Sequence, residues 1–477
     1  MRTPFCVKSY QLILGMLAGS MLCMSACKST ETDIQRASVE DKEQYSGGDN
    51  LTSNDLSDNA FGKQANNITF DEGVLFVVGN SLFQSNWVTA PSSVTSLDGL
   101  GPLMNQSSCG GCHFKDGRAK PPATETVTLN GLLFRLSIPG TGVHGESVHD
   151  PVYGEQLQDK AILGVTPESS VRVTYQPVSG QYADGTTYTL QKPVYELYNP
   201  NFGSFHAGLM VSPRIAQQIP GLGLLEAVSE PTILSFADET DKNKDGISGR
   251  PNYVWDVVNN KTSLGRFGWK ANVATIKQQT AGALQGDMGI TSSVFPASGL
   301  SESENELYSS LPNGGSPEIS DEQLNKIIFY VQTLSVPVRR DWTDKDILRG
   351  KYLFSQLNCS GCHIPKMQTA GTHTVSVLNN QTIRPYTDML LHDMGEGLAD
   401  NRPDFLANGQ EWRTAPLWGI GMVKTVNKHT NFLHDGRAFS LEEAILWHGG
   451  EAEKSATDFK KLSATDRASL IKFLESL

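Results

Sequence analysis

Basic residues are scarce in this sequence. Its 39 Lys and Arg residues are outnumbered by 51 Asp and Glu residues, which gives a formal net charge of -12. Because nucleic acids bind basic surfaces, this balance argues against a nucleic-acid partner. An acidic surface instead suits a small cationic donor protein.

Long apolar runs are also missing. The apolar run from Leu12 to Leu22 is shorter than the roughly 20 residues that a membrane-spanning helix needs. It follows basic residues and precedes Met24-Ser25-Ala26-Cys27, the order of a secretory signal with a lipobox. Residues 1–27 are therefore expected to be a lipoprotein signal peptide, with a transmembrane anchor as the alternative. Cys27 would carry the lipid, and Lys28 after it is typical of an outer-membrane lipoprotein, facing either the periplasm or the cell surface.

Cysteines are few, at seven in 477 residues, and four of them form two copies of one motif. These copies are Cys109-Gly110-Gly111-Cys112-His113 and Cys359-Ser360-Gly361-Cys362-His363. Two cysteines three apart and followed at once by histidine are the attachment signature of c-type haem. Each thiol can bond to a haem vinyl group, while the histidine binds the iron. The sequence thus predicts two covalently bound haem c groups.

A structural zinc site and a pair of redox dithiols are the alternatives to haem. Neither explains why histidine follows both cysteine pairs. Cys6 and Cys23 leave with the signal peptide and Cys27 takes the lipid, so the haem motifs use all the remaining cysteines. The mature chain is then left with no protein dithiol for redox chemistry.

The order of motifs along the chain predicts two domains after a tether. Residues 28–65 are rich in Ser, Thr, Asp, Asn and Gln, which predicts a disordered tether. A helical pattern leads into each haem motif, and another closes the chain. We therefore expect a mainly α protein with two cytochrome c-type haem domains, at 66–341 and 342–477. Loops and a small β-hairpin around Asp184-Gly185 would enlarge the N-terminal one.

Several longer motifs resemble those of one family of bacterial periplasmic proteins, the di-haem oxidoreductases. This family is related to the di-haem cytochrome c peroxidases. The resemblance covers nearly all of residues 68–477. The motifs that carry it are Gly99-Leu100-Gly101-Pro102, Ser212-Pro213-Arg214-Ile215, Gly265-Arg266-Phe267-Gly268-Trp269-Lys270, Gly286-Asp287-Met288-Gly289-Ile290 and the block from Leu391 to Thr414. A last motif, His434-Asp435-Gly436-Arg437, resembles the C-terminal haem domain of the related di-haem cytochrome c peroxidases.

The resemblance implies a second ligand for the C-terminal haem iron. In relatives, the residue fourteen places after the histidine of the last motif is this ligand, as methionine or tyrosine. Here it is His448, so His363 and His448 would form a bis-histidine haem of low potential. The alternatives are a surface histidine at position 448 and ligation by a methionine: Met389, Met394 or Met422.

The resemblance also implies that the N-terminal haem is the peroxide site. Its pocket needs a group that moves a proton, and Glu155 and Gln156 are the candidates. Both residues could equally be solvated in a loop. A histidine of the same domain could close this iron instead: His144, His149 or His206.

Two further residues and one loop are candidate functional elements. Trp269 could relay an electron between the haems, or simply be a core residue, and Arg266 could pair with haem propionates. Asp241, Asn243 and Asp245 have the spacing of a calcium loop. Asn252 stands at the loop's twelfth position in place of glutamate, so an Asp/Asn-rich turn is the alternative.

These observations lead to one functional hypothesis with an alternative. We expect a peroxidase-like di-haem c-type oxidoreductase in which the C-terminal haem relays electrons and the N-terminal haem performs the chemistry. A small redox protein or a quinone-linked donor would supply electrons, and hydrogen peroxide or another small oxidant would take them. The alternative is a non-catalytic di-haem electron-transfer protein, including one that serves iron handling at the outer membrane.

Overall fold

Short helices and small sheets alternate along the chain. The computed structural model describes residues 34–122 and 129–477, so the expected signal peptide and Cys27 lie outside the described residues. Residues 36–477 form one compact unit. No helix in the described ranges is both long and apolar enough to cross a membrane.

The expectation of a mainly α fold was wrong. Only 29% of the structure is helical and 19% is strand, in many small sheets. The longest strands, β6 (Ser170–Gln181) and β7 (Thr187–Tyr198), pair antiparallel around Asp184-Gly185. This confirms the hairpin, which is larger than expected. A second sheet has the order β4-β3-β8, with bounds Ser147–Val148, Leu132–Thr141 and Met210–Ile215. Segments in which apolar and polar residues alternate therefore form strands between the helices.

Two helix pairs hold the haem motifs. Helix α1 (Phe70–Gln84) precedes the first motif and packs on α7 (Asp321–Thr333). Helix α8 (Lys345–Gln356) precedes the second motif and packs on the C-terminal α12 (Ala464–Ser476). Each crossing needs a glycine, because a Cβ at Gly79 would collide with the Lys326 carbonyl and one at Gly350 with the Ser469 carbonyl.

The stretch expected to be a tether is ordered from residue 36 onward. Strand β1 (Thr52–Ser53) pairs in parallel with β11 (Val336–Pro337), and Leu51 and Phe61 are fully buried. The carboxylate of Glu43 forms a buried ion pair with Arg339. Buried apolar side chains and one ion pair thus hold this otherwise polar segment against the rest of the compact unit. The expectation for residues 28–65 was disorder.

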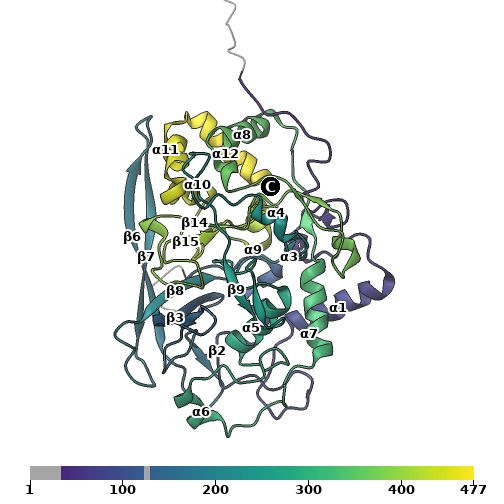
Figure 1. Cartoon of the computed structure of the whole chain (residues 1–477), viewed down its shortest axis with the longest axis vertical. Coiled ribbons are helices and arrows are strands. Elements are labelled where there is room, and N and C mark those ends of the chain that lie inside the picture. The colour runs from purple at the N-terminus through teal and green to yellow at the C-terminus, as the bar shows by residue number, and fades with distance from the viewer. Residues whose placement is uncertain (1–33, 123–128) are drawn as a thin grey trace, which may run out of the picture. The chain divides into compact units, whose positions relative to one another are not determined.

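The hairpin of the N-terminal half reaches the C-terminal half. In Figure 1, β6 and β7 run beside α10 (Leu441–Leu446) and α11 (Glu453–Lys461). At the hairpin tip, Tyr182 donates to Glu442, and Asp184 pairs with Arg467 at 2.8 Å. The remaining helices and strands are β2 (Leu103–Met104), α2 (Cys109–Cys112), β5 (Lys160–Ala161), α3 (Leu222–Glu226), α4 (Glu230–Leu234), β9 (Tyr253–Asp256), β10 (Lys261–Leu264), α5 (Ile276–Met288), α6 (Glu302–Tyr308), β12 (Met367–Gln368), β13 (Thr382–Ile383), β14 (Leu391–Asp393), β15 (Glu411–Arg413) and α9 (Val423–Asn427).

Candidate functional site

The first haem motif forms the one-turn helix α2, followed at once by His113. The Ser108 side chain caps this turn by accepting from the Gly111 amide. Nδ1 of His113 donates to the Gln217 carbonyl at 2.6 Å, and the Phe83 ring from α1 lies 6.2 Å from the imidazole. This hydrogen bond leaves Nε2 free, as is usual for a histidine that binds a metal.

The second haem motif repeats this arrangement. Nδ1 of His363 donates to the Tyr386 carbonyl at 2.9 Å. The Phe354 ring from α8 lies 6.2 Å from the imidazole. In both motifs, therefore, a hydrogen bond from Nδ1 and a nearby phenylalanine ring hold the imidazole, and Nε2 remains for the iron.

The thiol chemistry of the motifs argues against the alternatives to haem. Burial raises the pKa of Cys109 and of Cys359 to about 12. A redox dithiol needs a lowered pKa instead, because its thiolate is the reactive form. The described residues also contain no group of three or more His, Cys, Asp or Glu side chains that could hold a metal ion.

His448 lies beside the second motif. Its Nδ1 donates to the Ala444 carbonyl at 2.6 Å, which leaves Nε2 free as in His113 and His363. Burial lowers the pKa of His363 to about 4, and the nearby His448 imidazole adds to this effect. Both rings are thus kept neutral, as iron ligation requires.

Three other histidines of this half, His373, His392 and His429, are committed elsewhere, because both ring nitrogens of each form hydrogen bonds. Two of the competing methionines, Met389 and Met422, are buried in the hydrophobic core at 1% and 3% exposure. His448 therefore fits the role of second ligand better than these residues.

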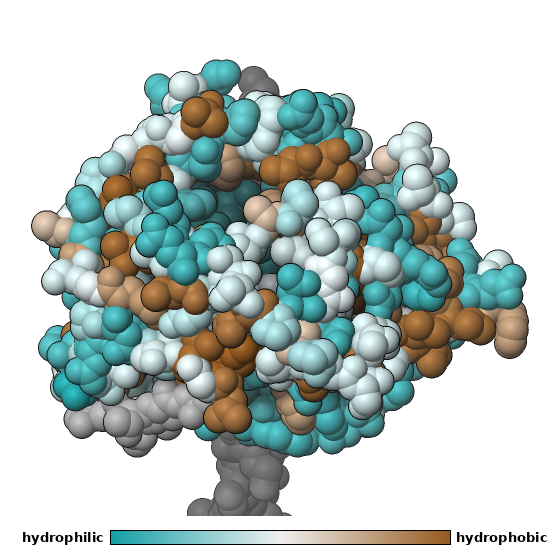
Figure 2. Space-filling model, turned by 90° about the horizontal axis from the view of Figure 1, so that it is seen from below, coloured by the Kyte–Doolittle hydropathy of each residue, from teal (hydrophilic) through white to brown (hydrophobic). Residues whose placement is uncertain are grey.

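A cavity of about 820 Å³ opens at the first motif. Its wall includes Cys109, Cys112 and His113 together with the expected Glu155, Gln156 and Trp269. The volume is within the range of roughly 300–1,000 Å³ that is typical of cofactor and ligand sites. Figure 2 shows that the face of the molecule seen from below is hollowed.

Glu155 reaches this cavity as an ion-paired carboxylate. Its Oε1 lies 2.8 Å from Nη1 of Arg135, and its Oε2 lies 3.8 Å from Nε2 of His149. Burial alone would raise the pKa of Glu155, but attraction by Arg135 and His149 leaves it below its ordinary value. Glu155 is therefore ionised at neutral pH and can accept a proton.

Gln156 is not a solvated loop residue, because its side chain is only 4% exposed. Its amide nitrogen donates to Asn105 Oδ1 at 2.6 Å and to Asp287 Oδ1 at 2.8 Å. These bonds hold the amide rigidly in the cavity wall.

The histidines expected near the first iron separate into two groups. His144 and His149 line the cavity, and the His144 ring stacks on Trp255 with centroids 3.7 Å apart. His206 is not part of the cavity wall, and its Nδ1 accepts from the Gly208 amide. Only the first two remain as candidates to close this iron.

Trp269 forms part of the wall between the cavity and the core of the C-terminal half. Its indole donates to the Ile215 carbonyl at 2.8 Å, and the side chain is 7% exposed. It belongs to the same hydrophobic cluster as Phe354 and Tyr386, which contact His363. A core role and a relay role are both compatible with this position.

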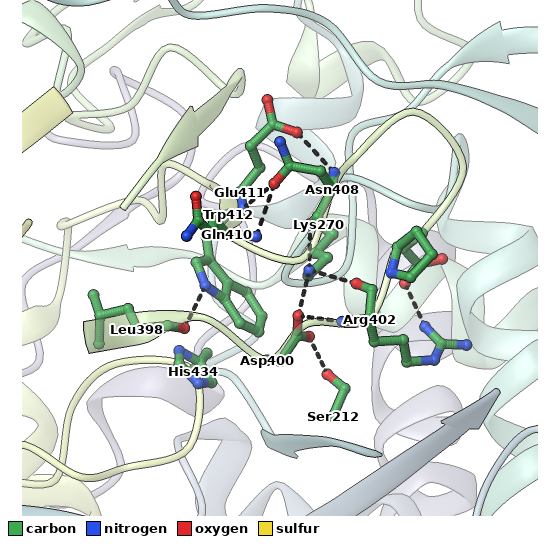
Figure 3. Close-up of polar contacts among 12 residues, drawn as sticks. Ser212, Lys270, Leu398, Asp400, Arg402, Asn408, Gln410, Glu411, Trp412 and His434 are labelled. Carbon is green, nitrogen blue, oxygen red and sulfur yellow. Dashed lines mark hydrogen bonds and ion pairs between the residues drawn. The ribbon is translucent and has the colours of Figure 1, made fainter. Parts of the chain in front are cut away.

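The next residue, Lys270, is fully buried at the centre of a polar network (Figure 3). Its ammonium donates to Asp400 Oδ1 at 2.7 Å, the Arg402 carbonyl at 2.8 Å and the Asn408 carbonyl at 2.7 Å. All three ammonium hydrogens are therefore used. Lys270 fastens the 400–408 loop, and with it Arg402, which lines the cavity.

Trp412 links this network to His434. The Lys270 ammonium lies 4.6 Å from the Trp412 ring centroid, and the other stacking partner of Trp412 is the His434 imidazole at 3.8 Å (Figure 3). Burial lowers the pKa of Lys270 to about 8 and that of His434 to about 4. His434 is thus a neutral ring in the core.

Arg266 and the calcium loop lie outside the cavity wall. Nη1 of the Arg266 guanidinium donates to the Leu225 and Val228 carbonyls, and the pairing of Arg266 with haem propionates stays a prediction. In the loop, the Asp241 and Asn243 side chains accept from the Asp245 amide, as in an Asx-rich turn. Asn252 is buried and bonds elsewhere, to Lys270, Asp404 and Leu406. Calcium binding by Asp241, Asn243 and Asp245 stays a prediction.

Three buried N–H groups without partners fit the acidic groups of haem. They are Nε of Arg402 in the cavity wall, Nε2 of His434 and Nε1 of Trp447. His434 and Trp447 flank the ion pair between Asp435 and Arg437. Nε2 of His434 is 3.6 Å from Asp435 Oδ2, and the Arg437 guanidinium lies 5.1 Å from the Trp447 ring. Trp447 directly precedes His448. Unpaired buried donors are rare in native proteins, and a haem brings two carboxylates that such donors can bind.

Some of these residues were missed from the sequence. Arg135, Arg402 and Trp447 reach the sites from separate segments, and no local pattern marks them. Lys270 is the last residue of the family motif Gly265–Lys270, but nothing in the sequence indicates that its side chain is buried.

One family model matches most of the chain. The family model described as "Di-haem oxidoreductase, putative peroxidase" matches residues 41–477. No curated protein matches the chain. Among solved structures, a hydrazine synthase of Kuenenia stuttgartiensis pressurised with xenon is similar at 17% identity, with a TM-score of 0.23. That match covers 34% of this chain and 57% of the other, so it carries no argument about function. The family match extends over most of the sequence and over both haem motifs, and the chain therefore belongs to the di-haem oxidoreductase family.

Proposed function

We propose that this protein is a peroxidase-like c-type oxidoreductase with two unequal haems. One haem would be attached to Cys109 and Cys112 with His113 on its iron, and the other to Cys359 and Cys362 with His363. The observation that carries the proposal is the contrast between their surroundings. His113 borders a cavity that contains an ionised Glu155, whereas His363 has the His448 imidazole as its neighbour.

Glu155 would move the proton at the first haem. A haem iron with an open face binds and reduces small oxidants. Reduction of hydrogen peroxide consumes two electrons and two protons and yields two waters. Glu155 would accept a proton from the bound peroxide and return it to the leaving oxygen, as a general base and then a general acid. Arg135 would hold the carboxylate in place through their 2.8 Å ion pair.

The second haem would supply the electrons. His363 and His448 would hold its iron, which would then be closed to substrates and would supply electron transfer only. Trp269 would carry electrons onward, which is supported by its place between the cavity and the hydrophobic cluster beside His363. A small redox protein or a quinone-linked donor would reduce this haem.

Residues outside the motifs would hold the haem carboxylates. Arg402 would serve the first haem, and His434 and Trp447 the second, because their buried ring or guanidinium nitrogens have no hydrogen-bond partner. We further propose a lipid on Cys27 that anchors the protein at the outer membrane, on the evidence of the signal-like N-terminus.

Electron paramagnetic resonance of the ferric protein tests this proposal. We expect one high-spin iron and one low-spin iron in equal amounts. His448→Ala should convert the low-spin signal to high-spin, whereas His373→Ala, whose ring nitrogens are both bonded elsewhere, should change neither signal. Two low-spin signals and no spectral response to peroxide would instead indicate a pure electron carrier.

A further inference from the structure

Helix α1 has more exposed large apolar residues than any other α-helix in the described ranges. Among the others, only α6 has such a residue, Leu307. Figure 2 shows hydrophobic surface at the right-hand edge of the molecule, the side on which Figure 1 places α1. The exposed residues of α1 have exposed fractions between 36% and 85% and are Phe70, Val74, Leu75, Val77 and Val78.

These five residues share one face of the helix. Phe70, Val74 and Val77 are spaced at i, i+4 and i+7, and Leu75 and Val78 widen this stripe. The opposite face packs on α7, where the ring centroid of Phe76 lies 4.8 Å from that of Tyr330. A helix with apolar residues on both faces is normally buried on both. The structure supplies a partner for only one face of α1.

Three of the five residues are valines, which are poorly suited to exposed positions of a helix. A β-branched side chain loses rotamer freedom in a helix, so valine forms helices less readily than alanine or leucine. At a surface position that nothing packs on, valine gains no burial to offset this cost. The valines are explained if a second apolar surface covers them.

The charges of α1 do not suit a lipid surface. The helix has no Lys or Arg, and its two charged residues, Asp71 and Glu72, are acidic. The Glu72 carboxylate is also used within the helix, because it accepts from the Thr69 amide. Helices that lie in a membrane interface are rich in Lys and Arg, which attract anionic lipids. The apolar face of α1 has no such group beside it.

A second copy of this chain can cover the face without any complementary charge. Two-fold symmetry brings the same patch of both copies together, so an apolar stripe meets an apolar stripe. The five side chains expose roughly 500 Å², as much as the largest apolar patch of a typical monomer. Two such patches would bury about 1,000 Å², the lower limit for a specific interface. Homodimer interfaces are also more apolar than those of transient complexes.

We propose that α1 is a self-association surface, which packs on α1 of a second copy of this chain around a two-fold axis. The inference does not depend on the proposed function. Phe83, which lies beside His113, belongs to the same helix. The interface therefore adjoins the first haem motif of each copy.

Sedimentation equilibrium of the ferric holoprotein tests this proposal. We expect a monomer–dimer equilibrium with a dissociation constant in the micromolar range. Val77→Glu brings two carboxylates into the interface and should raise this constant by about 100-fold or more. Val178→Glu is the matched control and should leave it unchanged. Val178 is 40% exposed in β6, on the opposite side of the molecule from α1 in Figure 1.

A cysteine placed in the face tests the same contact by cross-linking. The mature chain would have no other free thiol, because the haem motifs use all the remaining cysteines. Val74 is in the middle of the apolar stripe, so it lies near the two-fold axis of an α1 pair. On oxidation with copper phenanthroline, Val74→Cys should form a disulfide-linked dimer on a non-reducing gel, whereas Val178→Cys should remain a monomer.

Each outcome supports or overturns the proposal. A wild type that stays monomeric well above micromolar concentrations overturns it. If that monomer binds phosphatidylcholine vesicles and Val77→Glu does not, the face belongs to a lipid surface instead. A dimer that Val77→Glu leaves intact has its interface elsewhere, which also overturns the proposal. The haem absorption spectrum shows whether each variant is folded, and the Val74→Cys cross-link decides if Val77→Glu is not.

Discussion

His113 and His363 are held in almost the same way, but their surroundings differ. Each donates its Nδ1 hydrogen to a backbone carbonyl, and each has a phenylalanine ring at 6.2 Å from the preceding helix. The first borders a cavity of about 820 Å³, whereas the second has His448 as its neighbour. In the proposed function, the motif and its helix would attach the haem, and residues far away in sequence would decide whether its iron is open or closed.

The network around Lys270 supports both sites, so its removal should have the largest effect on stability. Lys270→Met would leave the carboxylate of Asp400 buried and unpaired. Breaking one partner of a buried pair costs about 3–5 kcal/mol, so we expect that loss in urea unfolding. Lys472→Met, which removes a surface pair with Asp346, should change stability by less than about 0.5 kcal/mol. Similar losses in the two variants would contradict the role given to Lys270.

Glu155 should matter for the first site alone. Glu155→Gln removes the proton acceptor, so we expect peroxide turnover to fall by about 100-fold or more, with an unchanged low-spin signal from the second haem. The matched control is Glu146→Gln, because Glu146 lines the same cavity but accepts from the His144 amide instead of pairing with Arg135. Turnover at the wild-type rate in the Glu155 variant would remove Glu155 from the mechanism.

The two helix crossings can be compared by equivalent substitutions. Gly79→Ala and Gly350→Ala would each press a methyl group against a carbonyl of the partner helix. We expect both to lose roughly 1–3 kcal/mol in urea unfolding, as is usual for overpacking. Gly73→Ala on the same helix as Gly79 meets nothing closer than 4.0 Å and should not destabilise the protein. A loss at only one crossing would show that the two are not equivalent.

The second site should be the more sensitive to acid. Burial alone would raise the pKa of Asp435, but attraction by His434, which is protonated only below about pH 4, and by Arg437 lowers it to about 2, from an ordinary value of 3.8. A lowered folded-state pKa stabilises the protein above about pH 4, and this contribution disappears as the pH falls through 2. It amounts to at most about 2 kcal/mol. Circular dichroism of Asp435→Asn should show a smaller loss of stability between pH 4 and 2 than in the wild type; an equal loss would contradict this assignment.

The sequence predicted some parts of the molecule well because their signals are local. The hairpin around Asp184-Gly185 and the helix that closes the chain need only turn and capping residues, and both are present. The mainly α expectation failed partly because some of the small sheets pair segments that are far apart in the sequence, such as β1 with β11 and β3 with β8. The expected tether failed for the same reason, since Glu43 finds its partner Arg339 almost 300 residues away.

By itself, the sequence determined the two haem motifs and the family, because a c-type motif and long family motifs are contiguous in the chain. It also marked His448, Glu155, Gln156 and Trp269, although only as candidates. The tertiary structure alone decided that the last three share one cavity with His113, that Arg266 lies outside it, and that Arg402, with its unpaired Nε, is in its wall. Whether a polar atom is buried and unpaired depends on every segment packed around it, and no local pattern encodes that.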